Sequence, residues 1–376
     1  MSFTLNHAAT HATLPPELWL EIFAYLDERS YTTSTLYTPF QPLPGVGSEV
    51  DVKSAYTIIV LVCRNWHDWA ISLLYRNLKI SDSDVLWTHN HPEYGQWVQR
   101  AILPYSSTMS DSQTRLSTEV LDLCPNIEVL IRPQHPSLSN QFDALCPQLS
   151  SLKRLEWWNG GSFDSFLSAL SAAPNLEYLF LGAQKFQPID SIPDHTPEIH
   201  LPSLHTLRLR IGLSRASRSI AHAIAKWSLP ALDTLVVDGQ MGLDEVWMSH
   251  GSRLRVLELG KDTSWLHGCL ALHEFNYNLP ISPLIRPGDL AYSSVTTIGC
   301  HVASPLPGYL ERSFLPLRSW FPNLQRLRIY GPLAGMLADG QFRFPAKLQR
   351  VSNRGLYIVE IIDKNGLVVS AYRPES

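Results

Sequence analysis

The sequence lacks several features that would mark particular classes of protein. Its 376 residues carry 34 acidic and 30 basic side chains, a formal net charge of −4, so no excess of positive charge attracts nucleic acid or an anionic membrane. The longest aliphatic run, 58–63, is far too short to span a bilayer. The first residues, MSFTLNHAATHAT, have neither a basic start nor an apolar centre and predict no secretory signal. We therefore expect a cytoplasmic or nuclear protein that binds neither nucleic acid nor membrane.

Motifs that bind phosphate or position a nucleophile are also missing. Neither GxxxxGK[ST] nor GxGxxG occurs, and no serine lies in a GxSxG sequence. The five cysteines are scattered, odd in number and without a CxxC pair, which predicts reduced thiols rather than disulfides. His89 and His91 have no neighbouring cysteine or aspartate, so a solvated loop is favoured over a metal site. We expect no enzyme, cofactor or metal; the enzymatic alternative is a hydrolase whose site is assembled across repeated units of the chain.

The first pattern that is present is a short amphipathic helix. Pro15 and Pro16 suit a helix start, where the missing N–H is tolerated. After them Leu18, Ile22 and Leu26 recur every four residues and form one apolar stripe. The spacing predicts a helix of about three turns.

Two further helices are predicted after a loop. Residues 28–52 are rich in proline, glycine and hydroxyl side chains and read as a loop, followed by helices at 53–62 and 64–77. The last helix carries Trp66 and Trp69 on one face. Three short helices have too little interior for so many large side chains, each of which contributes about 1.5–3 kcal/mol when fully buried. Part of this apolar surface should therefore face another domain or another protein.

These helices resemble the F-box motif. The resemblance rests on Leu14-Pro15-x-Glu17-x(4)-Ile22-x(3)-Leu26, followed by Val62-Cys63-Arg64-x-Trp66 and Leu73-Leu74-Tyr75. F-boxes are three-helix modules that dock on the Skp-type adaptor of cullin–RING ubiquitin ligases, although the family usually has a short turn in place of the loop 28–52. The resemblance implies an adaptor-binding surface made of Leu14, Pro15, Leu18, Ile22, Val62 and Trp66. The alternative is a plain helical cap on the following domain.

The remainder of the chain repeats the pattern Pro-x-Leu-x-x-Leu-x-Leu. Clear copies are PNLEYLFL (174–181), PSLHTLRL (202–209), PALDTLVV (230–237), SRLRVLEL (252–259) and PNLQRLRI (322–329). With weaker copies included, the first apolar positions fall at 127, 152, 176, 204, 232, 254, 272, 295, 324 and 348. Most intervals lie between 22 and 29 residues, which resembles the strand signature and period of leucine-rich repeats.

Helical patterns lie between some of these strands. SFDSFLSALSAA (162–173) and SIAHAIAKW (219–227) have apolar residues at helical spacing. The final segment reads as a hairpin with Asn365 and Gly366 at its turn. We therefore predict an α/β fold, in which a three-helix F-box precedes a leucine-rich-repeat solenoid with strands on the concave and helices on the convex side. The predicted domains are a disordered N-terminus (1–13), the F-box (14–80) with its loop insert (28–52), a linker or first helical segment (81–120) and the solenoid with its hairpin cap (121–376).

The alternation of side chains along each strand predicts a binding surface. If the leucines point inward, residues two, four and six positions after each first leucine face the concave side. Arginine and aromatic residues are enriched at binding hot spots. Arginines near the C-terminus would bind an acidic or phosphorylated segment through charge-assisted hydrogen bonds. The alternative for each position is a solvated polar side chain. The predicted target-binding residues are Trp158, Tyr178, Phe180, Arg208, Arg210, Arg326 and Arg328.

Together these patterns predict the substrate-recognition subunit of an SCF-type cullin–RING ubiquitin ligase. Its partners would be a Skp-type adaptor, through it a cullin, and a protein target held on the repeats. The alternative is a leucine-rich-repeat protein-binding scaffold unconnected to ubiquitin transfer.

Overall fold

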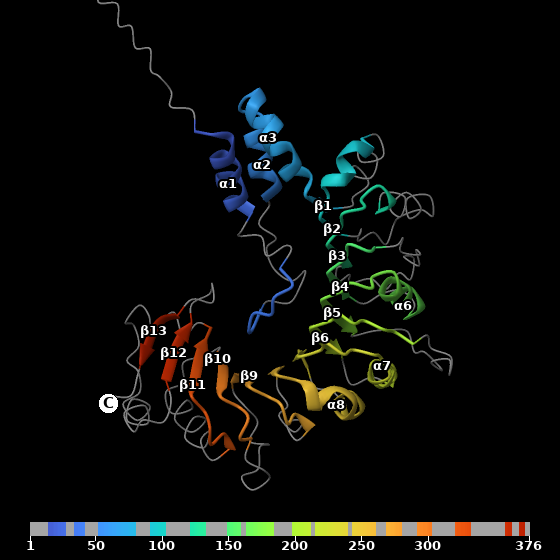
Figure 1. The fold of residues 1–376 in the computed structure, drawn as a ribbon, viewed down its shortest axis with the longest axis vertical. Coiled ribbons are helices and arrows are strands. Elements are labelled where there is room, and N and C mark those ends of the chain that lie inside the picture. Colours follow the sequence, from blue (N-terminus) through green and yellow to red (C-terminus); the bar gives the residue numbers. More distant parts are fainter. Residues whose placement is uncertain are drawn as a thin grey trace, which may run out of the picture.

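The computed structural model (Figure 1) describes fifteen stretches of the chain. They are residues 14–27, 34–41, 52–79, 91–102, 121–132, 149–158, 163–183, 198–211, 215–239, 243–260, 268–279, 292–302, 320–331, 358–362 and 368–372.

Thirteen strands form one curved sheet in which every strand lies beside its predecessor in the chain (Figure 1). Neighbouring strands are parallel from β1 to β12, and β13 pairs antiparallel with β12. The strands are β1 (Asn77–Lys79), β2 (Arg100–Ile102), β3 (Val129–Arg132), β4 (Arg154–Trp158), β5 (Tyr178–Ala183), β6 (Thr206–Ile211), β7 (Thr234–Val237), β8 (Val256–Leu259), β9 (Glu274–Leu279), β10 (Thr297–Val302), β11 (Arg326–Tyr330), β12 (Ile358–Ile362) and β13 (Val368–Tyr372).

The described helices lie in two places. At the N-terminus are α1 (Pro16–Asp27), α2 (Val52–Val60) and α3 (Arg64–Tyr75). The 3₁₀ helix η1 (Pro92–Trp97) lies between β1 and β2, and α6 (Phe163–Ser171), α7 (Arg215–Ala225), α8 (Asp244–His250) and η2 (Gly251–Arg253) lie between strands β4 and β8. None of the helices in the described stretches is both long and apolar enough to cross a membrane.

The repeat pattern positions the strands accurately. Strands β3 to β11 each begin two residues after one of the predicted first apolar positions. Because the strands pair in parallel, equivalent positions of successive repeats become neighbours, as Leu155, Leu179 and Leu207 do across β4, β5 and β6. All three are fully buried in the main core. The copy at 348 and the predicted turn at Asn365 and Gly366 lie outside the described residues, whereas β12 and β13 pair antiparallel, as a C-terminal hairpin requires.

Asparagine side chains join successive repeats outside the sheet. Asn126, Asn175 and Asn323, which follow the proline of their repeats, each donate from Nδ2 to a backbone carbonyl of the preceding repeat at 2.7–2.8 Å. In the copy at 252–259, where Arg253 stands at the asparagine position, its Nη1 donates to the carbonyl of Leu229 at 2.8 Å. Each such bond contributes about 0.5–1.5 kcal/mol and holds one repeat in register with the next.

The predicted architecture is wrong in its arrangement of helices, although the α/β class holds. Among the described residues, a named α-helix lies between neighbouring strands after β4, β6 and β7, and helical residues also occur at 121–122 and at 320; these described helices do not form a regular layer along the sheet. The strand motif specifies eight residues of each repeat, while the connecting segments rarely have the apolar spacing of a helix. The described residues form a single sheet with twelve consecutive parallel strands and few helices, which overturns the predicted arrangement of a separate F-box followed by a helix-backed solenoid.

The N-terminal helices run directly into the sheet. Only Arg76 separates α3 from β1, and its carbonyl accepts hydrogen bonds from the backbone N–H groups of Gln99 and Arg100 at the start of β2. Tyr75 at the end of α3 stacks on Tyr94 of η1 with ring centroids 4.8 Å apart. We expected the solenoid, and with it the sheet, to begin at residue 121. Strands β1 and β2 extend the sheet upstream of that residue, and the domain boundaries remain a prediction.

Candidate functional site

Aromatic rings hold the N-terminal helices together. The ring of Trp66 on α3 lies 4.6 Å from that of Trp19 and 5.2 Å from that of Phe23, both on α1. Tyr56 on α2 donates from its hydroxyl to the carbonyl of Phe23 at 3.0 Å. Edge-on and tilted ring pairs of this kind contribute about 0.5–1.5 kcal/mol beyond their buried area. The half-buried Trp69 packs against the same cluster.

The predicted adaptor-binding residues divide into an outer set and an inner one. Leu14, Leu18 and Ile22, spaced four residues apart, are 40–44% exposed, and Val62 is 55% exposed. Pro15 is also exposed, whereas Trp66 is half-buried behind them. Leucine, isoleucine and valine side chains normally lie in the core, so a stripe of them at the surface marks a possible docking surface.

The aromatic residues predicted to bind a target are buried. Trp158, Tyr178 and Phe180 are at most 1% exposed and form a small cluster of their own. They lie on the sheet face opposite the main core, as the alternation predicted, since the intervening Leu179 belongs to that core. Gly182, which pairs with Trp158, makes room for the indole ring, because an added Cβ would lie 2.5 Å from its Cε3 atom. These rings therefore belong to the packed interior of the concave side.

Three arginines lie over these rings, and two of them, Arg154 and Arg208, are paired with carboxylates. Guanidinium carbons lie 4.1–5.9 Å from ring centroids in the pairs Arg154–Tyr178, Arg208–Phe180 and Arg210–Trp158. Arg208 binds Asp238 through two contacts of 2.6 and 3.1 Å. The Asp238 carboxylate raises the pKa of Arg208 against the opposing effect of burial.

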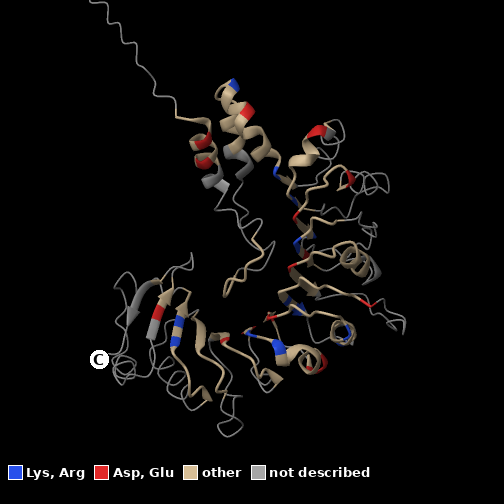
Figure 2. Ribbon diagram, in the orientation of Figure 1, with Lys and Arg blue, Asp and Glu red and all other residues tan. Residues whose placement is uncertain are grey.

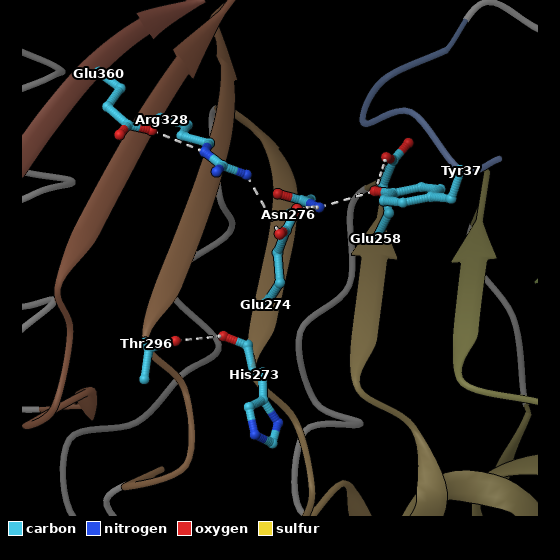
Figure 3. A network of polar contacts seen from close by, with 8 residues as sticks. All are labelled: Tyr37, Glu258, His273, Glu274, Asn276, Thr296, Arg328 and Glu360. Carbon is cyan, nitrogen blue, oxygen red and sulfur yellow. Dashed lines mark hydrogen bonds and ion pairs between the residues drawn. The ribbon is translucent and has the colours of Figure 1, made fainter. Parts of the chain in front are cut away.

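The two predicted arginines near the C-terminus differ in whether they are paired with carboxylates. Arg328 is half-buried between Glu360, at 2.9 Å, and Glu274, at 3.4 Å (Figure 3), whereas Arg326 is exposed. Basic and acidic residues alternate along the strands of the sheet (Figure 2). Because Arg208 and Arg328 already bind carboxylates, neither is a ready site for an acidic or phosphorylated ligand.

Sequence reasoning missed the segment that lies against this face. Residues 34–41, here called the inner segment, lie inside the curve of the sheet (Figure 1) although they belong to the loop between α1 and α2. The hydroxyl of Tyr37 donates to Glu258 of β8 at 2.7 Å and accepts from Asn276 of β9 at 2.8 Å (Figure 3). The backbone N–H of Phe40 donates to the same Glu258 carboxylate at 2.8 Å.

The inner segment also reaches strands far apart in the sheet. Thr35 donates from its hydroxyl to Glu177, next to β5, at 2.7 Å. The ring of Phe40 lies 5.4 Å from that of His301 on β10 and 5.0 Å from that of Tyr330 on β11. Strands are spaced about 4.8 Å apart and a chain extends at most about 3.5 Å per residue. Five residue steps, from Thr35 to Phe40, can join β5 to β11 because the segment takes the chord of a curved sheet rather than its arc.

Burial determines the ionisation of the central carboxylate. Desolvation raises the pKa of Glu258 to about 7, against the hydrogen bonds from Phe40 and Tyr37, which lower it. Desolvation and the neighbouring Glu258 charge likewise raise the pKa of the Tyr37 hydroxyl well above its usual value, so this hydroxyl keeps its proton. The pair can therefore act as donor and acceptor near neutral pH.

Phe40 has an unusual backbone conformation. Its φ is +56°, in the left-handed region that residues other than glycine adopt rarely and at a cost of the order of 1 kcal/mol or more. In this conformation its N–H reaches Glu258 while its ring reaches Tyr330. The sequence signal for such a role is weak: Tyr37 and Phe40 are two aromatic residues in a loop rich in proline, glycine and hydroxyl side chains.

The described residues contain no group of three or more histidine, cysteine or acidic side chains that could hold a metal ion. Of the cysteines in these stretches, Cys124, Cys269 and Cys300 are buried and Cys63 is exposed, and all four are free thiols. No protein-family model matches the chain, and no curated protein matches its sequence significantly.

Proposed function

We propose that this protein is the substrate-recognition subunit of a cullin–RING ubiquitin ligase in the cytoplasm or nucleus. In this proposal Leu14, Leu18 and Ile22 of the α1 region, with Val62 before α3, dock on a Skp-type adaptor. The sheet holds a protein target. The observation that carries the proposal is the exposed apolar stripe at the positions where the sequence resembles the F-box motif. Such a receptor does no chemistry itself and accelerates ubiquitin transfer by raising the local concentration of target lysines.

A protein-binding scaffold without ubiquitin transfer is the second candidate. It is favoured by the direct passage from α3 into β1 and by the stacking of Tyr75 on Tyr94, since both are what a helical cap on the sheet would need. Adaptor binding separates the two functions.

The test is co-expression of the full-length chain with a Skp-type adaptor, followed by size-exclusion chromatography. We expect a one-to-one complex. The substitution Leu18→Asp should weaken it by about 30-fold or more, as expected for an interface hot spot worth about 2 kcal/mol. Met248→Asp is the matched control, because Met248 is 87% exposed on α8, away from the stripe. A folded wild-type chain that elutes apart from the adaptor would favour the scaffold, and normal binding by Leu18→Asp would exclude this face.

A further inference from the structure

The contacts of the inner segment resemble those of a bound peptide. They are hydrogen bonds from side chains and single backbone groups, together with ring contacts, and no strand of the sheet pairs with it. Leu36 is 76% exposed, and Ser34 and Thr38 are also exposed, so alternate side chains point away from the sheet. A segment that formed part of the core would bury its leucine.

The sheet residues under this segment specify a particular ligand. Among the described residues, both groups that donate hydrogen bonds to Glu258 belong to the inner segment. The Tyr37 hydroxyl donates to Glu258 and accepts a hydrogen bond from the Asn276 amide. A ligand group at this position must therefore both donate and accept. Three residues further on, the rings of His301 and Tyr330 receive an aromatic side chain.

We propose that this face, centred on Glu258, Asn276 and Tyr330, is a binding site for an extended peptide with a tyrosine followed three residues later by an aromatic residue. In the uncomplexed protein the inner segment occupies the site and competes with that peptide. The ligand is unphosphorylated at the tyrosine, because a phosphate would meet the carboxylates of Glu258 and Glu274. The site itself is independent of the proposed function, which enters only in identifying the peptide as part of a ubiquitination target.

The competition is tested with the full-length chain, without adaptor, and a fluorescently labelled synthetic peptide of sequence STLYTPFQ, residues 34–41. Fluorescence anisotropy measures its binding. Tethering gives the inner segment an effective concentration in the millimolar range, so wild-type protein should bind the peptide at least about tenfold more weakly than the Tyr37→Ala/Phe40→Ala variant. Leu36→Ala is the matched control, because that side chain is exposed and its loss should leave the site occupied.

Two further arms locate the site. In the double variant, Glu258→Gln should weaken peptide binding by at least about tenfold, because it removes the charged acceptor of two hydrogen bonds. A peptide phosphorylated on its tyrosine should not bind measurably. Equal affinity with glutamine at this position, or tight binding of the phosphopeptide, would overturn the proposal.

Hydrogen exchange in the wild-type chain provides a second measurement if the double variant does not fold. Excess unlabelled peptide should accelerate exchange of the Phe40 amide by displacing the inner segment. Unchanged exchange at saturating peptide, or a folded double variant that binds no peptide, would refute the proposal. If the chain binds the peptide but not the adaptor, this site is upheld and the ligase function is refuted. If it binds the adaptor but not the peptide, the ligase function is upheld and this site is refuted.

Discussion

Removal of one oxygen atom, by Tyr37→Phe, should loosen the inner segment to a degree that depends on pH. The Tyr37 hydroxyl donates to Glu258, whose pKa is raised to about 7 by burial. At pH 8.5 the carboxylate is ionised, and a hydrogen bond to a charged group is worth about 1.5–3 kcal/mol. At pH 5.5 the carboxyl is protonated, and a neutral hydrogen bond is worth about 0.5–1.5 kcal/mol.

The sign of the pH effect follows from the direction of the pKa shift. Because burial raises the pKa of Glu258 in the folded chain, ionisation of this carboxyl costs folded-state stability, and the free energy of unfolding should fall as the pH rises through 7. The Tyr37 hydrogen bond lowers this pKa, so its loss raises the pKa further. If the two costs differ by about 1.4 kcal/mol, the substitution has moved the pKa by about one unit.

The assay is hydrogen exchange of the Phe40 amide, which donates to the same carboxylate. After correction for the intrinsic exchange rate, its protection factor should fall by about 13- to 160-fold at pH 8.5 and about 2- to 13-fold at pH 5.5. Glu258→Gln is the control background, because an amide does not ionise and the cost there should be the same at both pH values. An equal cost at both values in the wild-type background would refute this account of the site.

Two remaining predictions concern the packing of the sheet and its helices. Gly182→Ala should lower the free energy of unfolding, measured by thermal unfolding, by about 1–3 kcal/mol, because the new Cβ would lie 2.5 Å from the Trp158 ring. Gly268→Ala is the control: its Cβ would have no neighbour closer than 3.7 Å, and it should have little effect in the same experiment. Burial lowers the pKa of His250 in the folded chain below its usual value of about 6.5. As the pH falls, the unfolded chain is therefore protonated at this histidine before the folded chain is, and the free energy of unfolding should decrease below about pH 6.5. Urea unfolding at pH 5 and 7.5 should show His250→Gln removing that part of the pH dependence.

Each of these has a result that would contradict it. Identical melting temperatures for the Gly182 and Gly268 variants would mean that the indole relaxes without cost. An unchanged difference in stability between the two pH values in the His250 variant would assign the acid loss to another group.

The strands could be predicted from the sequence because their signal is local and repeated. Leu204, Leu207 and Leu209 recur at the same spacing in successive copies, and all three are buried as the pattern requires. Strands β1 and β2 escaped prediction because each has only three residues and neither follows the motif. The helical layer was predicted wrongly because the strand motif carries no information about the connections.

The inner face could be predicted only in part. Alternation placed Trp158 and Phe180 on the correct side of the sheet, but the arginines that cover them come from β6, which is one repeat beyond Phe180 and two beyond Trp158. The partnership of Tyr37 with Glu258 joins positions 221 residues apart, and no spacing within the loop identifies that partner. Contacts of this kind follow from the curvature of the finished sheet.

The inner segment also gives the protein a last step in folding. Each strand pairs with the strand made just before it, so the sheet can form while the chain is still being synthesised. Tyr37, in contrast, must wait for Glu258, 221 residues later, which at 5–20 residues per second takes roughly 10–45 s on the ribosome. Until β8 and β9 emerge, Thr35 can already reach Glu177, but Tyr37 and the Phe40 N–H lack the partners that hold them, so a chain truncated before these strands could not dock the inner segment fully.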